Sequence, residues 1–199
     1  MGGKWMKRYL VVLFAFFAVV ACAGLTLSDL VVVGGDGDDV GNDIVLLADG
    51  GVVIAGYTTS SEGTFFSSNG QEDFLIARFD EDLELIWWKA YGGSKRDVAQ
   101  ALTATRDGGF VLAGLTESSD GDVTGNKGLG DFWVISVSST GELEWQKTFG
   151  GSGQDYAYDV VETPEGNILV AGYTRSDNGD VLGYDWGEDF WIIELGRDG

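Results

Sequence analysis

The sequence repeats itself with a fixed period of 58 residues. Sliding the chain by 58 positions superimposes the same residue types without a gap: Ala55-Gly56, Ala113-Gly114 and Ala171-Gly172; Asp73-Phe74, Asp131-Phe132 and Asp189-Phe190; Gly34-Gly35, Gly92-Gly93 and Gly150-Gly151. A period of this length is typical of stacked or radial repeat proteins, in which each unit buries its apolar face against its neighbours. The repeat therefore constrains the fold more strongly than any single motif, although it names no ligand.

Each repeat carries four short runs with the composition of β-strands, separated by Gly-centred turns and one long loop. In the second repeat these runs are 97–105, 110–115, 132–137 and 143–149. No stretch has helical periodicity long enough to compete. We therefore predict an all-β fold, a β-propeller-type array of four-stranded antiparallel blades. Blade 1 is expected at about 39–91, blade 2 at about 97–149 and blade 3 at about 155–199.

The phase of the repeat bears on how the array ends. Residues 30–33 align with the last strand of a blade, so we expect them to complete blade 3 as a closing strand. Three blades fall short of the four to eight that propellers use. Two interpretations stay open: the chain is an incomplete propeller, a fragment of a longer protein, or two copies form a homodimer that closes a six-bladed ring. Otherwise the blade edges expose unpaired backbone groups.

Composition excludes several classes of function. The chain has a net charge of −20, no His and one Cys, with 44% hydrophobic residues. The apolar content is that of a globular protein. The lack of His and of spare Cys argues against zinc, haem and His-dependent catalysis. The negative charge argues against nucleic acid, whose phosphates attract Lys and Arg, but it permits cations, basic partners and neutral sugars, or simply keeps the protein soluble.

The N-terminus has the pattern of a secretory signal. Lys4, Lys7 and Arg8 precede an apolar run at 10–20 that is too short to span a bilayer. The sequence Val19-Val20-Ala21-Cys22 resembles the lipobox of bacterial lipoprotein precursors, in which the Cys is lipidated after cleavage. The resemblance implies a signal peptide at 1–21, lipidation of Cys22, a linker at 22–29 and a membrane anchor with more than one acyl chain. The alternative is an ordinary signal peptide with a chance Cys.

The repeats also resemble a known family. The stretch GGSGQDYAYDVVETPEGNILVAGYT at 150–174, followed by a loop and by DFWIIEL at 189–195, is similar to the bacterial seven-bladed β-propeller repeats (SBBP-type) and the related delta-60 repeats. The resemblance covers about 30–199, and the chain departs from it in blade number. It implies an extracytoplasmic propeller, usually without assigned activity; together with the lipobox, this leads us to expect a protein lipid-anchored in the bacterial cell envelope. Ala23 after the Cys resembles the outer-membrane sorting pattern of hosts with two membranes.

Two acidic positions recur in every repeat. Asp39, Asp97 and Asp155 begin the first strand of each blade, and Asp73, Asp131 and Asp189 begin the third. A carboxylate beside a Gly-Gly-Ser turn can accept hydrogen bonds from backbone N–H groups. A catalytic residue is needed only once, so recurrence favours a structural role for both sets.

The loops after the second strand of each blade hold acids in a less uniform pattern. Asp120 and Asp122 lie in the second loop, and Asp177, Asp180 and Asp185 lie in the third. Oxygen ligands at alternate positions around a Gly suit Ca²⁺, which takes six to eight oxygens. We therefore consider a calcium site at these residues, with solvated turn chemistry as the alternative.

Four aromatic residues break the repeat. Phe65 and Phe66 lie in the first long loop, and Tyr184 and Trp186 lie in the third. Aromatic side chains beside carboxylates suit sugar rings or a protein partner. The alternative is that they cover the edge of a blade.

The leading functional hypothesis is a non-catalytic binding or scaffold module that presents its acidic loops to a partner protein, a glycan or Ca²⁺. A second hypothesis is a carbohydrate-active enzyme with paired carboxylates, for which Asp36, Asp38 and Asp185 are the non-repeating acids. A third is a purely structural envelope protein. No nucleophile motif or charge relay supports the enzyme, so we expect no catalytic activity.

Overall fold

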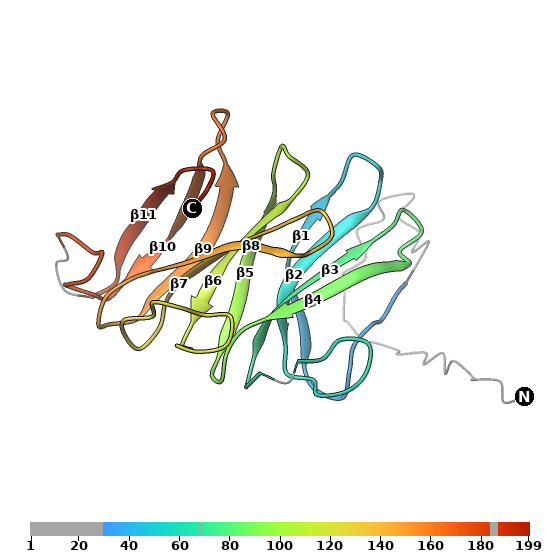
Figure 1. Cartoon of the computed structure of the whole chain (residues 1–199), viewed down its shortest axis with the longest axis horizontal. Coiled ribbons are helices and arrows are strands. Elements are labelled where there is room, and N and C mark those ends of the chain that lie inside the picture. The colour runs from blue at the N-terminus through green and yellow to red at the C-terminus, as the bar shows by residue number, and fades with distance from the viewer. Residues whose placement is uncertain (1–29, 68, 184–186) are drawn as a thin grey trace, which may run out of the picture. The chain divides into compact units, whose positions relative to one another are not determined.

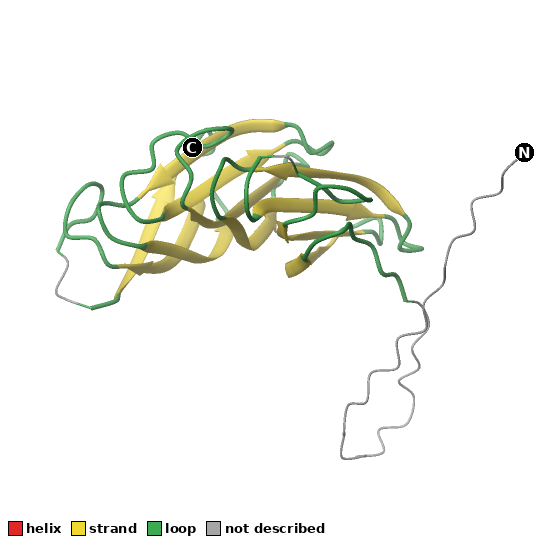
Figure 2. Ribbon diagram, turned by 90° about the horizontal axis from the view of Figure 1, so that it is seen from below, coloured by secondary structure: helices red, strands yellow, loops and turns green. Residues whose placement is uncertain are grey.

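The computed structural model describes residues 30–67, 69–183 and 187–199. All described strands belong to one compact unit, residues 31–199. These strands are β1 (Asp39–Leu46), β2 (Val52–Thr58), β3 (Asp73–Phe79), β4 (Leu85–Tyr91), β5 (Asp97–Ala104), β6 (Phe110–Thr116), β7 (Asp131–Val137), β8 (Leu143–Phe149), β9 (Asp155–Glu162), β10 (Ile168–Thr174) and β11 (Asp189–Leu195). The described residues contain no helix (Figure 2), and the predicted all-β class is confirmed.

The strands form three antiparallel sheets in chain order (Figure 1). Sheet 1 has the order β1-β2-β3-β4, sheet 2 has β5-β6-β7-β8, and sheet 3 has β11-β10-β9. Consecutive strands pair as neighbours, which short Gly-centred turns allow. The arrangement is blade-like, and the three sheets do not close into a ring.

Each sheet has a β-bulge at the same place in its first strand. The extra residues are Asn42, Gln100 and Tyr158, spaced by the 58-residue period. A bulge re-aims the side chain that it inserts. Asn42 Nδ2 donates a hydrogen bond of 2.7 Å to Ala99 O in sheet 2, and Gln100 Oε1 accepts one of 3.0 Å from the hydroxyl of Tyr156 in sheet 3. The bulges thus link each sheet to the next.

Apolar cores join neighbouring sheets through the same pair of aromatic positions. Phe74 packs on Trp133 between sheets 1 and 2, with ring centroids 4.4 Å apart. Phe132 packs on Trp191 between sheets 2 and 3, at 4.7 Å. In sheet 2, every residue of β6 and β7 is buried. Each fully buried large side chain contributes about 1.5–3 kcal/mol, so the sheets stabilise one another.

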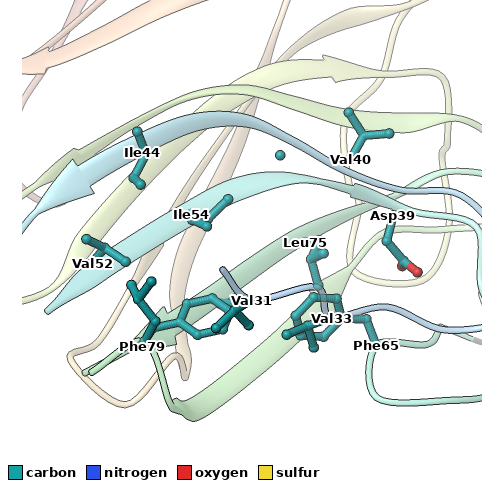
Figure 3. Close-up of a pocket in the computed structure, with 13 residues that line it drawn as sticks. Val31, Val33, Asp39, Val40, Ile44, Val52, Ile54, Phe65, Leu75 and Phe79 are labelled. Atoms are coloured by element: carbon teal, nitrogen blue, oxygen red, sulfur yellow. The ribbon is translucent and has the colours of Figure 1, made fainter. Parts of the chain in front are cut away.

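The predicted closing strand is not formed within the chain. Residues 31–33 have no strand conformation, and sheet 3 has three strands among the described residues. Val31 and Val33 instead lie over the outer face of sheet 1, where they line an apolar hollow with Phe65, Leu75 and Phe79 (Figure 3). Sheet 2 lies between sheet 1 and sheet 3 (Figure 1), so the segment cannot contact both outer sheets.

Candidate functional site: the turn–loop edge

The long loops and the Gly-Gly turns meet along one edge of the sheets, which we call the turn–loop edge. It consists of the loops after β2, β6 and β10 and of the segments 34–38, 92–96 and 150–154. Backbone hydrogen bonds join them: Asp122 N donates to Gly92 O at 2.9 Å, and Asp180 N donates to Gly150 O at 3.0 Å. Because strand direction alternates, these connections must lie on the same side, as the sequence predicts.

One recurring carboxylate organises each part of this edge; it is buried at Asp97 and Asp155 and half-buried at Asp39. In sheet 2, Asp97 Oδ2 accepts hydrogen bonds from Gly93 N and from Ser118 Oγ, both at 2.8 Å. Its Oδ1 accepts a third hydrogen bond from Thr116 Oγ1. The same contacts recur for Asp39 with Gly35, Thr58 and Ser60, and for Asp155 with Gly151, Thr174 and Ser176. The structural role predicted for these three aspartates is confirmed.

The Thr and Ser of this network were missed by sequence reasoning. They follow the second strand of each sheet as Thr-x-Ser: Thr58 and Ser60, Thr116 and Ser118, Thr174 and Ser176. All six side chains are buried. Their recurrence at the 58-residue period was the available signal, because polar residues that repeat at the end of an apolar strand need a shared partner.

The second recurring acid behaves differently from the prediction. Asp73 is 1% exposed, and within the described ranges neither of its carboxylate oxygens has a partner at full hydrogen-bond geometry, although the Ser67 hydroxyl lies near enough to lower its pKa. Asp131 Oδ2 accepts a hydrogen bond of 2.9 Å from Lys127 N, but its Oδ1 has no partner. The expectation that these residues bind the Gly-Gly-Ser turn is therefore wrong for both. Asp189, the third member, is only half-buried and pairs in register with Thr174.

Burial changes the ionisation of this second set. Loss of solvation raises the pKa of Asp73 to about 6, and the charges of Asp97 and Asp122 act in the same direction. Burial likewise raises the pKa of Asp131 to about 6. The carboxyl of Asp73 lies so close to Gly92 that a Cβ there would be 1.9 Å from Oδ1. A glycine is required at that position because the carboxyl occupies the space of a side chain.

The predicted calcium ligands hold the turns in place. Asp120 Oδ1 accepts a hydrogen bond of 2.7 Å from Ser94 N, and Asp122 Oδ2 accepts one of 3.1 Å from Gly92 N. Asp180 Oδ2 accepts a hydrogen bond from Gly150 N at 3.1 Å and also pairs with Lys127 Nζ. Asp177 is exposed, and Asp185 lies outside the described residues. Within the described ranges, no group of three or more acidic, His or Cys side chains is arranged to hold a metal ion.

The loop aromatics do not form one exposed cluster. Phe65 is 5% exposed and packs edge-on against Trp88, with ring centroids 5.7 Å apart. The prediction that Phe65 is available to a partner is therefore wrong, because its loop folds back over the face of sheet 1. Phe66 contacts the same Trp88 ring but keeps 46% of its surface exposed. Tyr184 and Trp186 lie outside the described residues.

The calcium hypothesis can be tested by thermal unfolding of residues 23–199 with and without excess Ca²⁺. Calcium would have to compete for oxygens that already accept backbone hydrogen bonds, so we expect the Tm to stay constant. A rise of the Tm that Asp180→Asn abolishes and Asp36→Asn preserves would contradict this expectation and support the calcium site.

The comparisons with known proteins leave the family open. A scan against protein-family models finds no match, and a search of curated proteins finds none either. The similarity to SBBP-type and delta-60 repeats therefore stays a prediction. No helix in the described part of the chain is long and apolar enough to cross a membrane.

Proposed function

We propose that this chain is a non-catalytic binding or scaffold module of the bacterial cell envelope, a β-propeller-type array anchored through a lipid on Cys22. The observation that supports the proposal is the structural role of the recurring aspartates. Asp39, Asp97 and Asp155 accept hydrogen bonds that connect turns to loops. The turn–loop edge is therefore a rigid platform whose remaining surface can meet a partner.

The state of the acids argues against a hydrolase with two carboxylates. Such an enzyme needs an acid of raised pKa that faces its substrate. Asp73 and Asp131 have raised pKa values but are buried. Asp36, a non-repeating acid, accepts hydrogen bonds from Glu62 N and Ser61 N, and these lower its pKa.

The proposed binding surface is the exposed part of the turn–loop edge. Phe66, Leu129 and Leu182 are large exposed apolar side chains in its three loops. Exposed carboxylates such as Asp120 and Asp177 belong to the same loops. Apolar groups beside hydrogen-bond acceptors suit a glycan or an envelope protein. Tyr184 and Trp186 of the third loop are further proposed contacts.

Binding can be measured by sedimentation of purified residues 23–199 with isolated bacterial envelopes. We expect Leu129→Asp combined with Leu182→Asp to weaken binding about tenfold or more, since an interface anchor contributes about 1–2 kcal/mol. The matched control is Leu46→Asp: Leu46 is exposed like Leu129 but lies at the turn after β1, on the opposite edge. Equal loss in the control would refute the assignment of this surface.

The anchor has its own test in a bacterial host. The full chain should incorporate radiolabelled fatty acid and partition into a detergent phase, because two or more acyl chains give stable attachment. We expect Cys22→Ser to abolish both properties while leaving the fold of 31–199 intact by circular dichroism. Incorporation of label into the Cys22→Ser variant would contradict the proposed anchor.

A further inference from the structure

Sheet 3 presents an uncovered apolar face, and sheet 1 presents an apolar hollow on its outer face. On sheet 1, Leu75 and Phe79 are 5% and 6% exposed beneath Phe65 and Val33, and with the half-buried Ile54 they line a hollow of about 350 Å³. On sheet 3, Phe190 is 77% exposed and Ile192 is 53% exposed. A soluble protein rarely leaves neighbouring large apolar side chains of a sheet uncovered, and such patches mark interaction sites.

The repeat shows that this face and this hollow are complementary. Phe190 and Ile192 occupy the positions of Phe74 and Ile76 in sheet 1, which are fully buried against sheet 2. In the same way, Ile54, Leu75 and Phe79 occupy the positions of Leu112, Trp133 and Val137, with which sheet 2 covers sheet 1. The apolar face of sheet 3 therefore resembles the face of sheet 1 that sheet 2 covers. The hollow on sheet 1 resembles the face of sheet 2 that covers sheet 1.

By the repeat, the segment 31–33 is equivalent to the fourth strand of a sheet. In the repeat, Val33 corresponds to Tyr91 of β4 and Phe149 of β8. Tyr91 pairs with Phe74, and Phe149 pairs with Phe132. Both also pack into the core shared with the next sheet. Val33 packs on sheet 1 in the same way, yet residues 31–33 pair with no strand among the described residues. The segment therefore lacks a pairing partner equivalent to β3 and β7. Strand β11 is the equivalent strand in sheet 3, and it lies at the edge of that sheet.

We propose that a second copy of this chain supplies the strand that pairs with residues 31–33. Strand β11 of one copy pairs antiparallel with residues 31–33 of the other, and its exposed face covers the hollow on sheet 1. The register follows from the described pairs: Phe190 lies opposite Val33, and Ile192 lies opposite Val31. Each copy has both surfaces, so two such contacts form a closed homodimer of six sheets. This contact goes beyond the proposed function and does not depend on any ligand.

The turn before β4 fits this occupant. Gly141 and Gly199 hold the equivalent position in the other sheets, and each packs against a Trp of the preceding sheet, Trp87 and Trp145. Sheet 1 has Leu83 there, with a φ of 59°, and its side chain helps to line the hollow. A preceding sheet with a Trp on its fourth strand would collide with Leu83. In the proposed contact the fourth strand beside β11 is residues 31–33 of the other copy, which are all Val and bring no such Trp.

Light scattering of residues 23–199, which include the whole compact unit 31–199, measures the association. We expect twice the mass of one chain. Phe190→Asp should give the monomer without loss of folded structure, because the side chain is exposed in one chain. The matched control is Leu129→Asp, at an exposed loop residue outside both surfaces, and it should remain a dimer. A monomeric wild type, or larger open assemblies, would overturn the proposal.

Disulfide trapping tests the register. Residues 23–199 contain no Cys, so introduced thiols are the only ones. Directly opposed residues in antiparallel strands have Cα atoms about 4.5–5.5 Å apart, within disulfide range. We expect a mixture of Val33→Cys chains and Phe190→Cys chains to form a covalent dimer on mild oxidation. The mixture of Val32→Cys and Phe190→Cys should react much less, since neighbouring side chains in a strand point to opposite faces. Equal yields from the two mixtures would exclude this register.

Discussion

Replacing Asp97 by alanine should lower the free energy of unfolding by about 3–5 kcal/mol. The carboxylate accepts hydrogen bonds from Gly93 N, Thr116 Oγ1 and Ser118 Oγ, and both hydroxyl bearers are buried. Removing it leaves several buried donors without an acceptor, at about 1–3 kcal/mol each. Urea unfolding followed by tryptophan fluorescence measures the change, with an unchanged m-value as evidence that the folded state is retained.

The chain contains its own control for this effect. Asp39 makes the same three contacts in sheet 1, but it is only half-buried and its bond to Gly35 N lies in an exposed segment. Thr58 and Ser60 are as buried as the hydroxyl partners of Asp97, but water can replace the lost acceptor at Gly35 N. Asp39→Ala should therefore cost less than Asp97→Ala, about 2–3 kcal/mol. Equal costs at the two positions would mean that the network does not derive its strength from burial.

The repeat allowed the strands and this network to be foreseen in part. A 58-residue period with Gly-centred turns predicted the three sheets, and an Asp after each Gly-Gly-Ser or Gly-Gly-Asp turn predicted its backbone partners. These predictions hold because the interactions are local or repeat with the period. The burial of Phe65 had a signal in the repeat, because the equivalent positions Val123 and Val181 are also apolar and are also buried. Its contact with Trp88 had no such signal, since Trp88 has no aromatic counterpart in sheet 2.

The pairing partner of segment 31–33 and the environments of Asp73 and Asp131 could not be predicted from the sequence, for a different reason. The repeat aligns 31–33 with β4, but it cannot say whether the strand that would pair with this segment belongs to the same chain. The sequence marks Asp73 only as a recurring acid, whereas the packing shows that it is buried and that no described residue bonds its oxygens with full hydrogen-bond geometry. Long-range burial decided both outcomes.

A second large effect should appear in the pH dependence of stability. Burial raises the pKa of Asp73 and of Asp131 to about 6 in the folded protein, against an ordinary value of 3.8. Between about pH 4 and pH 6 the folded state therefore binds more protons than the unfolded state, and stability falls as the pH rises. Above pH 6 both carboxylates are ionised while buried. Each pKa unit corresponds to about 1.4 kcal/mol, so the cost is at most about 3 kcal/mol per site.

Neutral replacements should remove this cost. We expect Asp131→Asn to stabilise the protein at pH 7.5 by about 1–3 kcal/mol, because the amide oxygen can still accept the hydrogen bond from Lys127 N without carrying a charge. The double variant with Asp73→Asn should gain more and should have a smaller slope between pH 4 and 6, part of which remains because burial also raises the pKa of Asp97. Comparison with the wild type at each pH cancels the general effect of the −20 net charge. Asp189→Asn is the matched control, since this residue is only half-buried in the outer sheet.

The outcome separates two roles for the buried acids. If the gain at pH 7.5 is present in Asp131→Asn and small in Asp189→Asn, burial of charge is the cause, and the recurring Asp is retained at the expense of stability. If Asp131→Asn instead destabilises the protein at pH 7.5, the ionised carboxylate is needed, and a cation or ordered water must satisfy the oxygen that has no partner in the described structure. Urea unfolding at pH 4.5, 6 and 7.5 distinguishes these results, because only the first predicts a gain that vanishes as the pH falls.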